Sequence, residues 1–309
     1  MARLIAVANM KGGVGKTTTV ISLAETLAAR SIDYASRTGR RQSTVLVVDL
    51  DAQASASFAL AGDERLLSLI RRGQTLDGFL DRYLIRREEV NLKSLIAHKV
   101  SDVSHHGWPL GIGLLAASPQ LRTVERALIH ALTRGGYSLE KIEHDLFKLL
   151  SEQIKGVSAN YDYVIFDCPP GISLLTEIAL RLSDLAVVPT VPDFLSLLGL
   201  DAFAQSVWTR LANTRSGLPA PSNVPHILIT KRRPTAAHDR KVAELRRRVA
   251  LGKAGYRIFA TEIPETEGVP EALERVTTQP NYARKWNAQI RTHLVDLAGE
   301  LESALMAMT

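Results

Sequence analysis

The sequence contains a single cysteine, Cys168, among 309 residues. One thiol cannot form a disulfide within the chain, and it cannot supply the thiolates that a cysteine-ligated metal cluster requires. No apolar run approaches the roughly 18 residues of a membrane span. The first apolar segment begins at once, without the pattern of a signal peptide. We therefore expect a soluble, cytoplasmic protein.

Internal repeats, low-complexity tracts and clear interdomain linkers are also absent from the sequence. Because 46% of the residues are hydrophobic and 23% are charged, the chain can bury a sizeable core. We predict a single domain over residues 1–309, with residues 31–44 and parts of 58–160 as insertions on its core. The first insertion is polar and basic, and we expect a surface loop or a helix extension there.

Short apolar runs alternate with segments whose apolar residues have helical spacing. Alternating strands and helices favour an α/β fold, in which a mostly parallel, twisted sheet carries helices on both faces. The runs that we predict to be strands lie at residues 4–8, 45–48, 163–166, 185–189 and 226–229.

Two adjacent histidines, His105 and His106, stand in the second insertion. Residues 58–160 are mostly helical in pattern, and the segment 105–109 (HHGWP) within them is predicted to be a loop. Paired histidines can bind a metal ion, but no third ligand is evident in the sequence.

Residues 10–18 (MKGGVGKTT) indicate the chemistry most directly. They lie between an apolar run and a helical pattern, which is the context of a phosphate-binding loop. The glycines allow backbone N–H groups to converge on phosphate oxygens at a helix N-terminus. Lys16 can reach the terminal phosphates, and the Thr17 hydroxyl can bind Mg²⁺. Met10 occupies the place of the usual first glycine, and Lys11 adds a second lysine at the loop entrance.

The pattern K-G-G-x-x-K-T resembles the deviant Walker A motif of the ParA/MinD family of P-loop ATPases. The chain is most similar to the ParA-type (Soj-like) members without an N-terminal helix-turn-helix domain. The resemblance implies a P-loop NTPase fold, ATP and Mg²⁺ as cofactors, and weak ATPase activity that a partner stimulates. It also implies an ATP-dependent homodimer, in which Lys11 of each subunit reaches the nucleotide of the other. The implied nucleotide-binding residues are Lys11, Gly12, Gly13, Val14, Gly15, Lys16, Thr17 and Thr18, with Thr230 and Pro264 near the adenine.

Two acidic segments extend the resemblance. Asp49 and Asp51 follow the second apolar run and Asp167 follows the third, at the sheet edge where α/β proteins bind ligands. The resemblance implies that Asp51 orients or deprotonates the attacking water, so that Lys11, Lys16 and Asp51 are the catalytic residues. It implies that Thr17, Asp49 and Asp167 hold or support the magnesium ion. Asp49 and Asp51 have a second interpretation, because a carboxylate after a strand often caps the next helix.

Basic residues are concentrated between residues 231 and 257. This window contains ten lysines and arginines but only two acidic residues, so its net charge is about +8, whereas the net charge of the whole chain is +6. We predict that the window contacts DNA phosphates without sequence specificity, and the alternative is an ordinary solvated helix face. The predicted DNA-binding residues are Lys231, Arg232, Arg233, Arg240, Lys241, Arg247, Arg248 and Lys253, with Arg275, Arg284, Lys285 and Arg291 extending the surface.

The resemblance leaves the cargo open. As a DNA partition ATPase, the protein would coat the nucleoid as an ATP dimer, and a ParB-like adaptor would stimulate hydrolysis and release it. A positioning ATPase with a protein cargo would use the same residues. A MinD-like membrane role requires a basic amphipathic C-terminal helix, but the last helical pattern carries Asp296, Glu300 and Glu302. We expect that pattern to pack in the core. An iron-protein relative would need two cysteines in each subunit.

Overall fold

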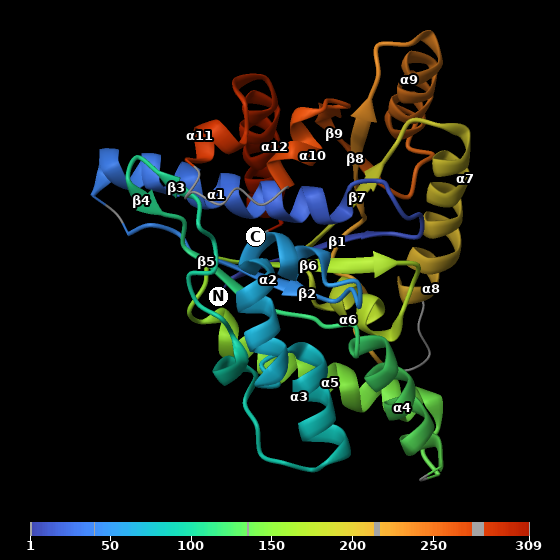
Figure 1. Cartoon of the computed structure of the whole chain (residues 1–309). Coiled ribbons are helices and arrows are strands. Elements are labelled where there is room, and N and C mark those ends of the chain that lie inside the picture. The colour runs from blue at the N-terminus through green and yellow to red at the C-terminus, as the bar shows by residue number, and fades with distance from the viewer. Residues whose placement is uncertain (1, 40, 135, 213–216, 274–280, 309) are drawn as a thin grey trace.

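Seven parallel strands form the central sheet of the computed structural model, which describes residues 2–39, 41–134, 136–212, 217–273 and 281–308. Their order across the sheet is β5-β2-β6-β1-β7-β8-β9 (Figure 1). The strands are β1 (Arg3–Asn9), β2 (Val45–Asp49), β5 (Ile112–Leu115), β6 (Tyr163–Pro170), β7 (Leu185–Thr190), β8 (His226–Arg232) and β9 (Arg257–Pro264). The predicted α/β fold with a parallel sheet is confirmed.

The two strands at the edges of the sheet, β5 and β9, are absent from the prediction. β5 is only four residues long and lies inside a stretch whose pattern is mostly helical. β9 pairs with only one strand, and just two of its eight residues, Phe259 and Thr261, are buried. Short runs and edge strands give the weakest hydrophobic signal in a sequence.

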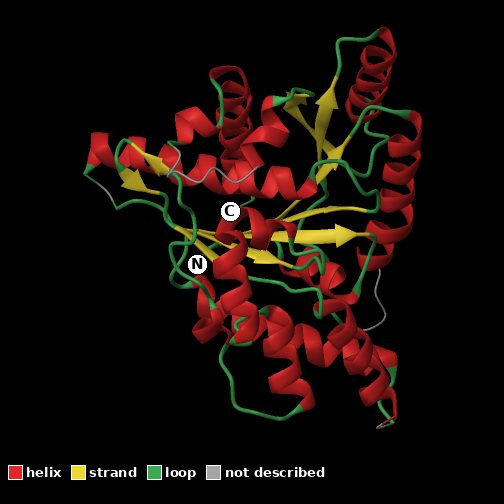
Figure 2. Cartoon of the chain, in the orientation of Figure 1, coloured by secondary structure: helices red, strands yellow, loops and turns green. Residues whose placement is uncertain are grey.

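Helices cover both faces of the sheet, and each face has its own apolar core (Figure 2). One core lies beneath α1 (Lys16–Thr38), α2 (Ser55–Arg71), α10 (Gly268–Leu273), α11 (Tyr282–Lys285) and α12 (Ala288–Met306). The opposite core lies beneath α3 (Leu76–Leu80), α4 (Leu121–Arg134), α5 (Leu139–Ser158), α6 (Leu174–Leu182), α7 (Phe194–Ala202) and α9 (Ala236–Ala250). Shorter elements are the π-helical turns Asp81–Ile85 and Phe203–Trp208, the 3₁₀ turn Leu92–Leu95 and α8 (Thr209–Ala212).

Helix α1 extends well beyond the core, through Thr38. It ends at Gly39, whose φ of 68° is in the left-handed region and whose N–H donates to the Ala35 carbonyl at 2.8 Å. Residues 31–38 of the first insertion are thus a helix extension, which was one of the two expected forms. The boundaries of the insertions remain a prediction.

The second insertion contains a small hairpin of β3 (Ser104–His105) and β4 (Trp108–Pro109). The prediction that residues 105–109 form a loop is therefore wrong at its two ends. The hairpin packs against the far end of α1 and against α11, which are distant in sequence, and local periodicity does not report such packing (Figure 1).

Helix α12 packs in the core, as expected. Its residues Ile290, Leu294, Leu297, Leu301 and Leu305 are at most 2% exposed. None of the described helices is long and apolar enough to cross a membrane.

A buried ion pair joins α11 to α1. The Lys285 ammonium lies 2.6 Å from Glu25 Oε1, and the neighbouring Trp286 indole donates to Glu25 Oε2 at 2.7 Å. The prediction that Lys285 extends a DNA-binding surface is wrong, because its side chain is only 9% exposed and its charge is paired with Glu25. Arg275 lies outside the described residues.

Candidate functional site

The loop between β1 and α1 presents backbone N–H groups at a helix N-terminus, and those of residues 12–16 have no partner among the described residues. Gly13 and Gly15 adopt φ values of 73° and 88°, which side chains other than glycine rarely tolerate. Gly15 is the N-cap of α1 and has no side chain to occupy the first-turn N–H groups. Asn9 fixes the loop entrance, since its amide donates to the Pro189 carbonyl and its Oδ1 accepts from the Lys11 N–H. The result is a preformed anion site.

The Lys16 side chain lies within this loop. Its ammonium donates to the Lys11 carbonyl at 3.1 Å, and the residue is only 7% exposed. Burial lowers the pKa of this ammonium, whereas the nearby carboxylates of Asp167 and Asp51 raise it. A phosphate at the loop would supply the negative charge that this partly desolvated cation lacks.

Thr17 and Asp167 form a pair suited to a divalent cation. The Thr17 hydroxyl donates to Asp167 Oδ2 at 2.8 Å, and Asp167 Oδ1 is buried without a hydrogen-bond partner among the described residues. Burial raises the pKa of Asp167 well above its usual range, and the adjacent Asp49 raises it further. A hydroxyl and an unsatisfied carboxylate oxygen are the ligands that Mg²⁺ prefers, so this donor set fits the ion.

Asp49 and Asp51 have different surroundings at the end of β2. Asp49 Oδ1 accepts from the Asp51 N–H, and Oδ2 accepts from both the N–H and the hydroxyl of Ser57. Burial raises the pKa of Asp49 to about 6, although these donors lower it. Asp49 therefore holds the start of α2 and the turn that carries Asp51. Its predicted role in a magnesium shell remains a prediction.

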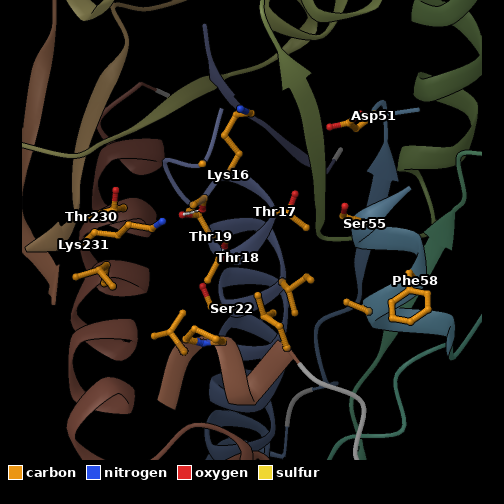
Figure 3. Close-up of a pocket in the computed structure, with 18 of the residues that line it drawn as sticks. Lys16, Thr17, Thr18, Thr19, Ser22, Asp51, Ser55, Phe58, Thr230 and Lys231 are labelled. Atoms are coloured by element: carbon orange, nitrogen blue, oxygen red, sulfur yellow. Dashed lines mark hydrogen bonds between the residues drawn. The ribbon is translucent and has the colours of Figure 1, made fainter. Parts of the chain in front are cut away.

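A cavity of about 840 Å³ opens from the loop, a volume within the ordinary range for ligand sites. Figure 3 shows Thr230 and Lys231 on one side of α1, and Asp51, Ser55 and Phe58 on the other. Pro264 also lines the cavity, as do apolar residues of α12 such as Leu294 and Leu297. The Thr230 hydroxyl donates to the Val14 carbonyl at 2.8 Å, so it ties the loop to β8. Adenine contacts at Thr230 and Pro264 stay a prediction.

The second lysine of the loop, Lys11, points away from this cavity and does not contribute to its described lining. Its ammonium contacts Asp193 Oδ2 at 3.1 Å and the Ser196 hydroxyl at 2.9 Å, at the start of α7. Neither partner was predicted from the sequence. The pattern Asp193-x-x-Ser196 signals a helix N-cap, and the Asp193 side chain does accept from the Ser196 N–H. That local signal could not predict a contact with a loop 182 residues away.

Comparisons with known proteins identify the family. A family model described as "AAA domain" matches residues 2–218. The chromosome-partitioning ATPase Soj of Thermus thermophilus is 30% identical over 272 residues, which cover 87% of this chain and 84% of that protein. The chain belongs to the ParA/Soj family of P-loop ATPases.

The fold agrees with this family assignment. A plasmid partition protein of Borrelia burgdorferi B31, solved with AMPPNP, superimposes with a TM-score of 0.64 at 20% identity. That match covers 98% of this chain and 99% of the other. A Pseudomonas putida relative is 31% identical over 207 residues, but the match spans only 63% of that protein's length and 67% of this chain. The predicted ParA-type identity and the P-loop fold are confirmed.

The basic window of this ParA/Soj family member is less exposed than its sequence predicts. Arg232 bonds Glu262 at 2.9 Å and also pairs with Asp239, so its side chain is only 17% exposed. Arg248 bonds both Asp201 and Glu244. Arg232 is thus paired with one carboxylate inside the window, Asp239, and with one outside it, Glu262. Its contact with DNA stays a prediction.

Of three other predicted DNA-binding residues, two have acidic partners and one lines the nucleotide cavity. Arg233 pairs with Glu265, and Lys241 bonds Glu244 at 3.1 Å. Lys231 lines the cavity. The remaining residues, Arg240, Arg247 and Lys253, are exposed and have no acidic partner among the described residues. Arg240 and Arg247 are seven residues apart on α9 and so share one helical face.

Proposed function

We propose that this ParA/Soj family member hydrolyses ATP at the phosphate loop and that ATP joins two copies of the chain. The orientation of Lys11 carries the proposal. This lysine stands at the entrance of the loop, yet its ammonium lies outside its own cavity. It is held at the start of α7 by Asp193, whose side chain is 38% exposed, and by the buried Ser196. A cation in this position is available to the nucleotide of a second copy.

The residues of the site have separable roles in this proposal. The loop N–H groups and Lys16 bind the phosphates, and Thr17 with Asp167 would hold Mg²⁺. A bound Mg²⁺ neutralises charge on the phosphoryl oxygens. Asp51 orients the attacking water and accepts its proton, and it is placed for this by the bond from its N–H to Asp49. Phosphoryl transfer depends mainly on positioning and electrostatics, which is what these groups supply.

The surface beside Lys11 favours a second copy as the occupant. Phe194, Leu195 and Leu198 of α7 are 68%, 65% and 59% exposed, although they are large and apolar. They adjoin Asp193 and Ser196, the residues that hold Lys11. Burial of this patch against the same patch of a second copy would stabilise the dimer at the point where the nucleotides meet.

Asp193→Asn is expected to increase the dimer fraction with AMPPNP by up to about 5-fold. An exposed ion pair contributes at most about 1 kcal/mol, and its loss releases Lys11 for the other subunit. Asparagine retains the oxygen that caps α7. Sedimentation velocity at fixed protein concentration measures the fraction, and Asp145→Asn, which removes the ion pair of Lys141 on α5, is the matched control. A dimer fraction equal to that of the control would show that the Asp193 contact does not restrain Lys11.

We further propose that the dimer binds DNA through α9 without reading sequence, and that a ParB-like adaptor stimulates hydrolysis and releases it. Support comes from the partitioning role in the name of the Thermus relative. It also comes from Arg240 and Arg247 of α9, which are exposed and have no acidic partner in the part of the chain that the structure describes. Figure 1 shows α9 standing out from the edge of the sheet, where a long polyanion can reach it.

The double variant Arg240→Ala/Arg247→Ala tests the DNA interface. Each lost phosphate contact is expected to reduce the slope of log affinity against log salt by about 0.9. Cosedimentation with duplex DNA at several salt concentrations, with AMPPNP and with ADP, gives this slope. Lys148→Ala/Lys155→Ala is the matched control, because these exposed lysines have the same spacing on α5. Equal slopes in the two double variants, or equal binding with AMPPNP and ADP, would remove α9 from the proposal.

A further inference from the structure

We propose that the far end of α1 carries a zinc site formed by Asp33, His105 and His106. His105 Nε2 lies 2.8 Å and His106 Nε2 lies 3.2 Å from the same atom, Asp33 Oδ1. The three ligand atoms all lie within 4.8 Å of one another. Two imidazole nitrogens thus converge on one carboxylate oxygen.

These distances suit a common metal ion. Zn²⁺ binds imidazole nitrogen and carboxylate oxygen at about 2.0–2.2 Å, and tetrahedral ligands at that range are about 3.3 Å apart. The two nitrogen–oxygen spacings, 2.8 and 3.2 Å, are close to this value, and the third spacing is at most 4.8 Å. Side-chain rotation of the exposed His106 and Asp33 can bring the three atoms to the distances that the ion requires.

The ligands come from the two segments that were predicted to be insertions. Asp33 lies on the extension of α1, and the histidines lie at the turn of the β3–β4 hairpin. The hairpin is itself fixed to α11 by a bridge between Ser104 and Asn281 and by the edge of Tyr282 against the His105 ring. The site is therefore assembled on elements that have rigid neighbours.

The two-residue turn of the hairpin presents His106 beside His105. His106 and Gly107 have φ values of 49° and 81°, and positive values at both positions are what a type I′ hairpin turn requires. The conformation places the second ring beside the first, with ring centroids 4.1 Å apart.

The donor set and the exposure determine which ion fits. Two imidazoles and one carboxylate are typical of Zn²⁺, whereas Mg²⁺ and Ca²⁺ prefer oxygen ligands alone. The His105 side chain is 11% exposed, but those of Asp33 and His106 are 43% and 68% exposed. Water can therefore complete the coordination at the open side.

This site is separate from the phosphate loop. Thr17 and Asp33 are 16 residues apart on one helix, which corresponds to about 24 Å along α1. An ion at Asp33 would join the end of α1 to the hairpin and, through the hairpin, to α11. Its expected effect is to stabilise the end of the molecule remote from the nucleotide.

Zinc titration of the full chain in excess Mg²⁺ tests the proposal. We expect one Zn²⁺ per chain with a micromolar or lower Kd, a rise in Tm on binding, and a visible d–d absorption when Co²⁺ replaces Zn²⁺. His106→Gln and Asp33→Asn should each weaken binding by at least about 10-fold, because even outer-shell partners of a metal contribute 10- to 100-fold. Both residues are partly or fully exposed, so both variants should fold.

His144→Gln is the matched control, since His144 is also exposed and lies 3.6 Å from the Asp145 carboxylate but has no second histidine. It should bind Zn²⁺ as the parent does. The proposal is overturned if the parent binds no stoichiometric Zn²⁺, or if either His106→Gln or Asp33→Asn binds as tightly as the control. In those cases the cluster is a hydrogen-bonded histidine–aspartate group that only fixes the hairpin.

Discussion

Asp51→Asn is expected to lower ATP turnover by about 10²- to 10⁴-fold, the usual contribution of a positioned general base. Asparagine has the same shape and can still accept the bond that Asp51 Oδ1 receives from the Gln53 N–H at 2.9 Å. The turn after β2 should therefore keep its conformation. Nucleotide affinity should change by no more than a few-fold, because Lys16, Thr17 and the loop N–H groups are intact.

The loss of turnover should also trap the ATP-bound dimer. Phosphate release under steady-state conditions measures turnover, fluorescence-labelled ATP measures binding, and sedimentation velocity with ATP measures the dimer. Asp63→Asn is the control, because this exposed carboxylate lies on the adjacent helix α2 and outside the lining of the cavity. Turnover in Asp51→Asn within a few-fold of the control would exclude Asp51 as the catalytic base.

Lys11→Ala is expected to lower turnover by about 10³-fold, within the range that a cation supplied in trans contributes to phosphoryl transfer. It should also abolish the ATP-dependent dimer. ATP binding by the single chain should persist, since the Lys11 side chain is directed to Asp193 and not into the cavity. The backbone N–H of Lys11 and its bond to Asn9 remain in the alanine variant.

The Lys11 and Asp51 variants should have opposite effects on the amount of dimer, so the two variants test the model together. Asp51→Asn accumulates the dimer with ATP, Lys11→Ala prevents it, and the double variant should be monomeric. Lys141→Ala is the control, because Lys141 is also exposed and paired with an aspartate. A Lys11→Ala protein that dimerises with AMPPNP as well as the control would contradict the shared-site model. In that case Lys11 only stabilises the start of α7.

Most of the nucleotide site could be predicted because its parts are local. A phosphate loop requires glycines and a lysine at fixed spacing between a strand and a helix, and contiguous residues encode that requirement. The same holds for Asp51 and Asp167, since each follows an apolar run and parallel strands end at one edge of the sheet. Five of the seven strands were predicted for this reason, and the two edge strands were not.

The partners of charged side chains could not be predicted in the same way. Lys11 was expected to serve a second subunit, but its contact with Asp193 depends on how β1 and α7 meet across the sheet. Lys285 was expected on a surface and instead pairs with Glu25, 260 residues away. Arg232 was expected to bind DNA, and the fold places Glu262 beside it. Charge counted along the chain does not reveal which carboxylates the fold brings near.

The histidine pair was likewise visible in the sequence, whereas its acidic partner was not. The sequence showed two adjacent histidines without a third ligand, and the fold placed Asp33 beside them because α1 is long enough to reach the hairpin. The phosphate loop, the parallel sheet and the family follow from the sequence alone, since hydrophobic periodicity and fixed motif spacing are local properties. Which distant residues meet is known only from the folded structure, because such contacts depend on the packing of whole helices and strands.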